Sequence, residues 1–326
     1  LIGVISILEV ITILVDGAPE LIIKTPATSA NMGPGFDCLG MAVNLHNELW
    51  LKILPEGAES VISVEGYGEG TSDNLDNVIY KTYVNAFESH GLEIKPVAMH
   101  CINRVPFARG LGSSSAAAVS GLTVAQIVSG NHFTEDDIMQ MATAIDGHPD
   151  NVLPAILGGI VIGCMSNEGK VVAQKMSPLP NLYAYALIPD YPLPTSMARA
   201  AMPESYSRAD VVHNLGHLGY LVAALANGSV DALKDAFSDR VHEPYRMPLM
   251  PGMEEAKEIA LRNGALAALV SGAGSTMLIL SDEQRDYRDS QKALEKLGYG
   301  SELIEVAPIA TGVQVYKDGM ELELWP

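Results

Sequence analysis

A glycine-serine turn that opens directly into an alanine-rich stretch constrains this chain more than any other feature, and it occupies residues 104–121. Gly110 and Gly112 permit a positive φ and a close approach of the backbone to a ligand. Three serines follow at residues 113–115, where the first unpaired N–H groups of a helix need acceptors. An anion bound there would meet several donors and the positive end of the helix dipole. The pattern predicts either a phosphate-binding turn or a serine-capped buried helix, and the turn alone does not separate the two.

The size and charge of the chain exclude several classes of protein. Its 326 residues are enough for two domains or one large one. The 39 acidic and 20 basic residues give a net charge of −19, which repels nucleic acid and anionic membranes over most of the surface. We therefore expect no nucleic-acid partner and no membrane partner. A small anionic ligand is compatible with this net charge, because backbone N–H groups, a few arginines and a divalent cation make the potential positive at one site.

The three cysteines indicate a reducing compartment. Cys38, Cys101 and Cys164 are widely separated and show neither metal-ligand spacing nor a disulfide framework. They are typical of small buried apolar residues in a cytoplasmic protein.

The first residues of the chain are apolar and have two interpretations. Residues 1–15 contain Glu9 as their one charge, lack the basic region and cleavage site of a secretory signal, and are too short for a membrane span. They are either an added edge strand or an extension absent from the mature protein.

Strand and helix signals alternate irregularly along the chain. The expected strands are 21–24, 49–54, 61–65, 97–103, 158–165, 170–174, 183–188, 267–270, 276–280 and 312–324, and the expected helices are 76–90, 114–128, 134–147, 197–201, 211–226, 230–237, 254–262 and 286–297. Strict βαβ alternation is missing, so the pattern favours an α+β fold. We expect an extension at 1–19, an N-terminal domain at 20–178 and a C-terminal domain at 179–326.

Four segments carry polar residues that core packing does not require. The first, residues 26–37, reads as a loop with an amide and a carboxylate six residues apart. The second is the turn at 110–115. The third is Asp-Gly-His-Pro-Asp-Asn at 146–151, between an apolar helix and an apolar strand. The fourth is a second glycine turn, Ser-Gly-Ala-Gly-Ser-Thr at 271–276, which joins two strands.

The first, second and fourth segments resemble the three motifs of the GHMP small-molecule kinases in order and spacing, over nearly the whole chain from about Leu21. Within that superfamily, Pro-Ala-Thr-Ser-Ala-Asn-Met-Gly-Pro-Gly-Phe-Asp-Cys-Leu-Gly, Gly-His-Pro-Asp-Asn-Val and His-Glu-Pro-Tyr-Arg-Met-Pro-Leu-Met-Pro-Gly are similar to homoserine kinases. The resemblance implies a two-domain GHMP fold, with a ribosomal-protein-S5-like N-terminal domain and a ferredoxin-like α/β C-terminal domain. It implies transfer of the γ-phosphoryl group of ATP to L-homoserine on the way to threonine, with Mg²⁺, in a cytoplasmic enzyme and a homodimer.

The same resemblance assigns an ATP subsite and a metal site. The ATP-binding set is Asn77, Pro106, Arg109, Gly110, Leu111, Gly112, Ser113, Ser114 and Ser115. Ser114 and Asp146 are similar to the metal ligands, and Asp146 stands where the family usually has glutamate. This shorter carboxylate binds Mg²⁺ either directly or through a water. No lysine follows the last glycine as in a Walker-type loop, so backbone N–H groups and Mg²⁺ must neutralise the phosphates.

The resemblance also implies an amino-acid subsite. Its residues are Asn31, Asp37, His148, Thr195, Arg199 and Arg246. Asp37 suits an ammonium group, and the two arginines suit an α-carboxylate because a guanidinium fork forms two parallel hydrogen bonds. Asp37 and Asp146 are the residues expected at the catalytic centre. No residue stands out as a general base, because an ammonium group occupies Asp37.

Two other functions stay open. One is a GHMP-type kinase for another hydroxylated small molecule, although paired arginines beside an acid favour an amino acid over a sugar. The other is a catalytically silent ligand-binding protein on the same fold. Asp146 and Ser275, which stands where the family more often has proline, are the features that point to it.

Overall fold

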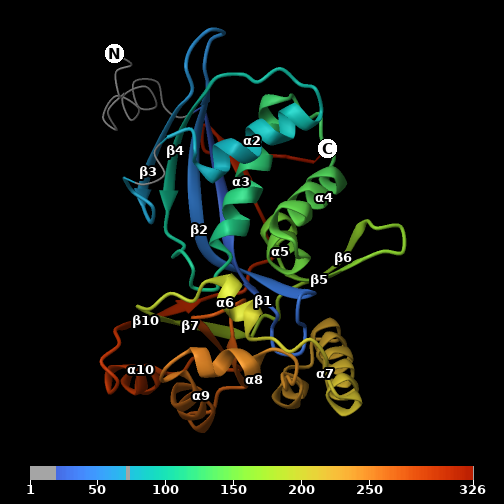
Figure 1. Ribbon diagram of the computed structural model, residues 1–326, viewed down its shortest axis with the longest axis vertical. Coiled ribbons are helices and arrows are strands. Elements are labelled where there is room, and N and C mark those ends of the chain that lie inside the picture. Colours follow the sequence, from blue (N-terminus) through green and yellow to red (C-terminus); the bar gives the residue numbers. More distant parts are fainter. Residues whose placement is uncertain (1–19, 71–73, 326) are drawn as a thin grey trace.

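The computed structural model describes residues 20–70 and 74–325, which form two β-sheets with helices packed against each (Figure 1). The expected extension at 1–19 lies outside the described residues. The first sheet contains β1 (Leu21–Ala30), β2 (Leu39–Ile53), β3 (Val61–Gly66), β4 (Val97–Asn103), β5 (Ile160–Met165), β6 (Val171–Met176), β11 (Gln314–Lys317) and β12 (Met320–Leu322). The strand order is β12-β11-β1-β2-β4-β3, and β5 pairs with β2 and β6. The β3–β4 pair is parallel and the others are antiparallel.

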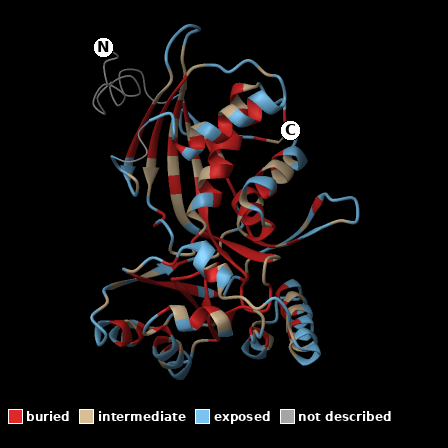
Figure 2. Cartoon of the chain, viewed as in Figure 1, coloured by how far each residue is buried: buried red, intermediate tan, exposed pale blue. Residues whose placement is uncertain are grey.

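Four helices cover one face of the first sheet. They are α2 (Val78–Ser89), α3 (Ser113–Val128), α4 (Glu135–Asp146) and α5 (Pro149–Leu157). The small residues of α3 let its neighbours approach closely: a Cβ at Gly121 would lie 2.5 Å from the carbonyl oxygen of Ile79 on α2. Helix α3 is consequently buried along most of its length, and its N-terminus points toward the second sheet (Figures 1 and 2).

The second sheet is smaller and fully antiparallel. It contains β7 (Tyr183–Pro189), β8 (Ala267–Val270), β9 (Met277–Ser281) and β10 (Ser301–Val306) in the order β10-β7-β9-β8. The helices of this part are α6 (Thr195–Ala200), α7 (Arg208–Ala226), α8 (Glu243–Arg246), α9 (Met253–Arg262) and α10 (Arg288–Glu295), with 3₁₀ helices η1 (Val230–Asp235) and η2 (Met247–Leu249).

Alternating side chains of β7 join the two parts. Ala184 and Ala186 belong to a hydrophobic cluster that includes Met41 of the first sheet, whereas Tyr185 and Leu187 pack in a cluster with α9 and α10. Both faces of the second sheet are therefore buried, and one of them forms a core shared with the first sheet. This shared core fixes the junction at which the loops of both parts meet.

The chain crosses from the first sheet to the second between β6 and β7 and returns to the first sheet at β11. A division at residues 178 and 179 remains our proposal, and in it β11 and β12 pack with the first part although they lie in 179–326. No helix in residues 20–70 and 74–325 has the length and apolar character that a membrane span needs.

The loop predicted at 26–37 begins later, because residues 26–30 belong to a strand. Strand β1 continues to Ala30, and β2 begins at Leu39 rather than at residue 49. Polar residues here are buried because each finds a partner from a distant segment: Thr28 donates to Asn151 Oδ1 at 2.8 Å, and the hydroxyl oxygens of Ser29 and Ser271 lie 2.9 Å apart, within hydrogen-bond distance. A sequence pattern shows the polar residues and not these partners.

Other elements also differ from the expectation. No helix was expected at residues 149–157, which form α5, or at residues 243–249, which form α8 and η2, and β10 at 301–306 was not expected. Residues 230–235 form a 3₁₀ helix, and the expected last strand at 312–324 is a hairpin. Helix α5 begins with Pro149 at its first turn, where a missing N–H costs nothing, and it also contains Pro154.

Candidate active site

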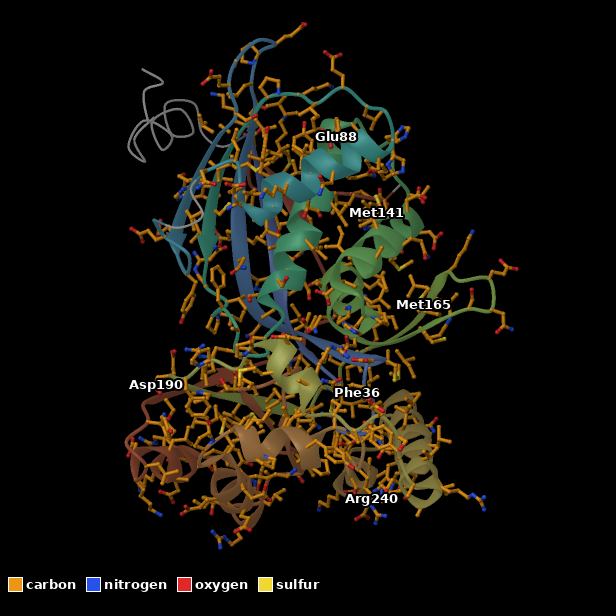
Figure 3. The ribbon with its side chains drawn as sticks, in the orientation of Figure 1. Phe36, Glu88, Met141, Met165, Asp190 and Arg240 are labelled. Atoms are coloured by element: carbon orange, nitrogen blue, oxygen red, sulfur yellow. The ribbon has the colours of Figure 1, made fainter. Side chains whose placement is uncertain are left out.

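Most predicted site residues line one cavity of about 410 Å³ at the junction of the two parts. These residues are Asn31, Asp37, Gly110, Gly112, Ser113, Ser114, Ser115, Asp146, His148, Thr195, Arg199 and Arg246. They come from the β1–β2 loop, the N-terminus of α3, the α4–α5 connection, α6 and α8. Phe36, which lies in the β1–β2 loop, marks this junction in Figure 3.

The glycine-serine turn leads into the N-terminus of α3. Gly110 and Gly112 have φ of 76° and 69°, as the sequence predicts. A Cβ at Gly110 would lie 2.1 Å from the carbonyl oxygen of Ser271, and one at Gly112 would lie 2.0 Å from Thr28 Oγ1. The backbone N–H groups of residues 113–115 find no acceptor among the described residues. These free donors at the positive end of a buried helix suit phosphate oxygens.

The second glycine turn braces the first. Thr276 donates its N–H to the carbonyl of Arg109 at 3.0 Å, and Ser271 Oγ donates to the carbonyl of Gly110 at 2.6 Å. Residues 271–276 therefore hold the glycine-serine turn from the second part of the molecule. Gly272 and Ala273 also line the cavity.

The predicted metal ligands lie beside α3, with one rearrangement. Ser115 Oγ, rather than Ser114, donates to Asp146 Oδ1 at 2.9 Å. Ser114 is exposed to the cavity, and its hydroxyl has no hydrogen-bond partner among the described residues. Burial raises the pKa of Asp146, against the hydrogen bond from Ser115 and the charges of His148 and Arg199.

The Ser114 hydroxyl and the Asp146 carboxylate are too few to hold a metal ion without other ligands, but they suit Mg²⁺. No group of three His, Cys, Asp or Glu side chains able to hold a metal occurs in residues 20–70 and 74–325. Mg²⁺ keeps several waters and needs one or two carboxylates plus phosphate oxygens. A free hydroxyl at Ser114 and a carboxylate at Asp146 match that need.

Asp37 and Arg199 form an ion pair at the predicted amino-acid subsite. Arg199 Nη2 lies 2.8 Å from Asp37 Oδ1, and Nη1 lies 3.3 Å from Oδ2. His148 Nε2 lies 4.0 Å from Asp37 Oδ2. The structure thus places an anionic and a cationic group side by side in the cavity.

Arg246 is 2% exposed and faces the same cavity. Its Nη1 donates to the carbonyl of Gly272 at 2.8 Å, and its guanidinium lies 5.1 Å from the ring centre of Phe36. Burial and the charge of Arg199 lower its pKa. Within the described residues, the Nε atoms of Arg199 and Arg246 are both buried without a hydrogen-bond partner. Both arginines line the cavity, so their guanidinium charges suit an anionic ligand there.

Asn31 shapes the loop that carries Asp37. Its Oδ1 accepts the N–H of Asp37 at 3.1 Å, and its Nδ2 donates to the carbonyl of Gly272 at 2.7 Å. Asn31 and Asp37 both have positive φ, which non-glycine residues adopt mainly where the surroundings enforce it. Thr195 is the exposed first residue of α6 and lines the cavity.

A second cavity of about 220 Å³ adjoins the first, because Ser113 and Ser114 line both. Asn77 lies in its wall and caps α2 by accepting the N–H of Ile79 at 2.9 Å. The remaining wall includes Val78 and Phe107. This partly apolar space is suited to a flat heterocycle whose attached phosphates reach α3.

Three residues of the predicted ATP set lie in neither cavity. Arg109 donates to the carbonyls of Pro189 at 3.0 Å and Asp190 at 2.7 Å, and Asp190 lies far from Phe36 in Figure 3. Leu111 is in the hydrophobic core. Pro106 lines a different cavity together with Arg109. A sequence motif marks the loop but not the direction of each side chain, and an ATP contact for these three stays a prediction.

Asp150 and Asn151 line the main cavity without having been assigned a role from sequence. Asp150 is 4% exposed on the first turn of α5, and burial together with Asp37 and Asp146 raises its pKa to about 7. Asn151 accepts the hydroxyl of Thr28. The run of polar residues at 146–151 indicated a functional segment, but the sequence did not show which of its side chains face the cavity.

We expect Asp150→Asn to stabilise the metal-free protein at pH 8. The raised pKa means that the folded state holds a proton that the unfolded state releases above pH of about 4, so the wild-type carboxylate destabilises the fold as pH rises to about 7. The variant should melt several degrees higher at pH 8, with a smaller gain at pH 5. Thermal melts in EDTA measure this, with exposed Asp136→Asn as control; a gain that does not vary with pH would contradict it.

Comparisons with known proteins agree with this geometry. Residues 77–159 match the family model for the GHMP kinases N terminal domain, and residues 221–300 match GHMP kinases C terminal. A homoserine kinase of Desulfitobacterium hafniense is 40% identical over 277 residues, which are 84% of this chain and 92% of that protein. One from a Synechococcus strain is 34% identical over 297 residues, 90% of this chain and 97% of that protein.

The chain belongs to the homoserine kinase family of GHMP kinases. A crystal structure of homoserine kinase from Cytophaga hutchinsonii superposes with a TM-score of 0.81 at 27% identity, covering 92% of this chain and 98% of that one. The predicted two-domain GHMP fold is confirmed by these matches and by the two sheets. A member of this family is a kinase.

Proposed function

We propose that this chain transfers the γ-phosphoryl group of ATP to the side-chain hydroxyl of L-homoserine and releases O-phospho-L-homoserine. One observation carries the proposal: the free N–H groups at the N-terminus of α3 open into the same cavity as Asp37, Arg199 and Arg246. A triphosphate and an amino acid would therefore meet end to end. The homoserine kinases similar to this chain support the choice of acceptor.

The nucleotide would span the two adjoining cavities. Its adenine would lie beside Asn77 in the smaller cavity. Its phosphate oxygens would accept hydrogen bonds from the backbone N–H groups of residues 113–115. Ser114 and Asp146 would hold Mg²⁺. When bound, this ion neutralises charge on the β- and γ-phosphates. Gly110 and Gly112 leave the room that the phosphates need at the turn.

Bound homoserine would break the Asp37–Arg199 ion pair and form one ion pair with each of these two side chains. Its ammonium group would bind Asp37, and its carboxylate would bind Arg199 and Arg246, whose guanidinium groups line the cavity. His148 and Thr195 would contact the bound amino acid. A sugar or mevalonate lacks the ammonium group, so it would leave Asp37 without a new partner.

The reaction depends mainly on alignment and charge. The side chains of the amino-acid subsite direct the hydroxyl toward the γ-phosphate, and the α3 donors stabilise negative charge that develops on the phosphoryl oxygens. Asp37 and Asp146 are the acidic residues that would touch substrate and metal. We assign no general base, since the ammonium group occupies Asp37.

Cell location and assembly belong to the same proposal. The three cysteines are free thiols, as expected of a reducing cytoplasm, where we place the enzyme. The homodimer also remains part of the proposal.

A coupled ADP-release assay tests the activity. We expect Mg²⁺-dependent turnover with L-homoserine and much weaker turnover with L-threonine, mevalonate and galactose. Faster turnover of mevalonate or galactose would favour a kinase for another hydroxylated molecule. If none of the four acceptors supported turnover, the kinase assignment would be wrong and a silent binding protein would be favoured.

A further inference from the structure

His242 is a fully buried histidine between two parts of the amino-acid subsite. It directly precedes α8, and Arg246 follows one helical turn later. Its Nε2 lies 2.8 Å from the carbonyl oxygen of Gly33 in the β1–β2 loop. Its Nδ1 lies 3.5 Å from Arg246 Nη1, a long hydrogen-bond distance. One ring thus reaches both the loop that carries Asp37 and the side chain expected to hold a carboxylate.

These contacts determine the tautomer of the ring. A carbonyl oxygen only accepts, so Nε2 carries the proton and donates to Gly33. Arg246 only donates, so Nδ1 must be the unprotonated acceptor. Burial lowers the pKa of His242, opposed by Asp239 and Glu243 and assisted by Arg246, and the ring is therefore neutral near pH 7. A neutral ring with Nε2–H satisfies both neighbours.

The backbone of His242 is held in place by Asp239. Asp239 Oδ2 accepts the N–H groups of His242 at 2.8 Å and Glu243 at 2.7 Å, and Oδ1 accepts Asn214 Nδ2 at 2.8 Å. The His242 ring also stacks on Phe36, with ring centres 5.5 Å apart and planes 22° apart. Backbone and ring are both fixed, so the ring can serve as a rigid support.

Arg246 is consequently oriented from three sides. Gly272 accepts from Nη1, His242 faces the same nitrogen, and the guanidinium lies over Phe36. Its Nε is left without a partner among the described residues. The support leaves the rest of the fork available for a ligand in the cavity.

We propose that His242 is a positioning residue of the amino-acid subsite: its neutral ring orients Arg246 for the α-carboxylate and anchors, through Gly33, the loop that carries Asp37. The inference rests on the proposed function, because it takes the ligand to be an α-amino acid. It gives a role to the histidine of the His-Glu-Pro-Tyr-Arg motif, which is otherwise used only for its arginine.

Two substitutions separate the two hydrogen bonds. His242→Gln places an amide N–H near the position of Nε2, which keeps the donor to Gly33 and removes the acceptor for Arg246. His242→Asn places an amide oxygen near the position of Nδ1, which keeps the acceptor for Arg246 and removes the donor to Gly33. Exposed His132→Gln is the matched control.

The readout compares L-homoserine with 3-amino-1-propanol, the same amino alcohol without its carboxylate. We expect His242→Gln to lower kcat/KM for homoserine about tenfold, as for one lost buried hydrogen bond, while the value for 3-amino-1-propanol and the KM for ATP change less than about twofold. His242→Asn should lower kcat/KM for both amino alcohols by a similar factor, because the loop with Asp37 binds their shared ammonium group.

Several outcomes would overturn this role. They are equal losses on both substrates in His242→Gln, an equal rise in the KM for ATP, or no change in either variant. If thermal melts show that neither variant folds, His242 is a core residue and the inference is also wrong. Wild-type turnover is measured first: its absence would contradict the proposed function, whereas wild-type turnover without a selective effect of His242→Gln contradicts this inference alone.

Discussion

Arg246→Ala should raise the KM for homoserine about a hundredfold and leave the KM for ATP within about threefold of the wild type. The side chain is buried, faces the cavity, and has an Nε without a partner among the described residues. Charge-assisted hydrogen bonds contribute about 1.5–3 kcal/mol each, and two of them to one carboxylate correspond to a factor of about a hundred or more.

A milder substitution separates charge from geometry. Arg246→Lys keeps the positive charge but loses the planar fork, so its KM for homoserine should lie between those of the wild type and the alanine variant. Arg262→Ala, at the exposed end of α9, is the matched control and should leave both KM values unchanged.

Initial rates at varied homoserine and at varied ATP measure these effects. Arg246 also packs against Phe36 and binds Gly272, so a thermal melt of each variant accompanies the kinetics. An unchanged KM for homoserine in a folded Arg246→Ala protein would remove this arginine from the amino-acid subsite.

Asp146→Ala should lower kcat at saturating ATP and homoserine by two to three orders of magnitude, on the order of 3–4 kcal/mol of transition-state stabilisation. Asp146 is the carboxylate beside the N-terminus of α3, where Ser115 orients it. Its loss would leave Ser114 as the remaining predicted ligand of Mg²⁺ from the protein. The concentration of Mg²⁺ needed for half-maximal rate should rise as well.

Two variants sharpen that test. Asp136→Ala removes an exposed carboxylate from the first turn of the same helix and should leave the dependence on Mg²⁺ unchanged. Asp146→Glu restores the longer side chain that is usual in the family and should keep most of the activity. A full rate for Asp146→Ala at low Mg²⁺ would show that this carboxylate does not serve the metal.

The sequence predicted the glycine-serine turn more reliably than the helices and strands around it. Glycine at 110 and 112 has a local physical meaning, because a residue without a Cβ atom adopts a positive φ at little steric cost. Helix α5 and strand β10 were missed, since Pro154 and the two glutamates of β10 carry no signal of their packing partners. The continuation of β1 to Ala30 likewise depends on hydrogen bonds to segments far along the chain.

The sequence identified the residues of the site but not the directions of their side chains. Sequence placed Ser114 with Asp146, but Ser115 is the serine that turns inward on α3 and bonds this carboxylate. Arg109 belongs to the turn, yet it points to the carbonyls of Pro189 and Asp190 and fastens the turn to the second part. The sequence assigned no role to Asp150. The structure shows that this residue is buried beside Asp37 and Asp146, which raises its pKa.

By itself, the sequence determined the family, the positive φ of the glycine-serine turn, and the charged residue types that suit an amino acid and ATP. Those depend on local backbone freedom and on the chemistry of each side chain. The tertiary structure alone decided that Asp37 pairs with Arg199, that His242 supports Arg246, and that Gly272 accepts from both Asn31 and Arg246. Each of these contacts joins residues close in space but mostly far apart in the chain, and they form only when both sheets pack on their shared core.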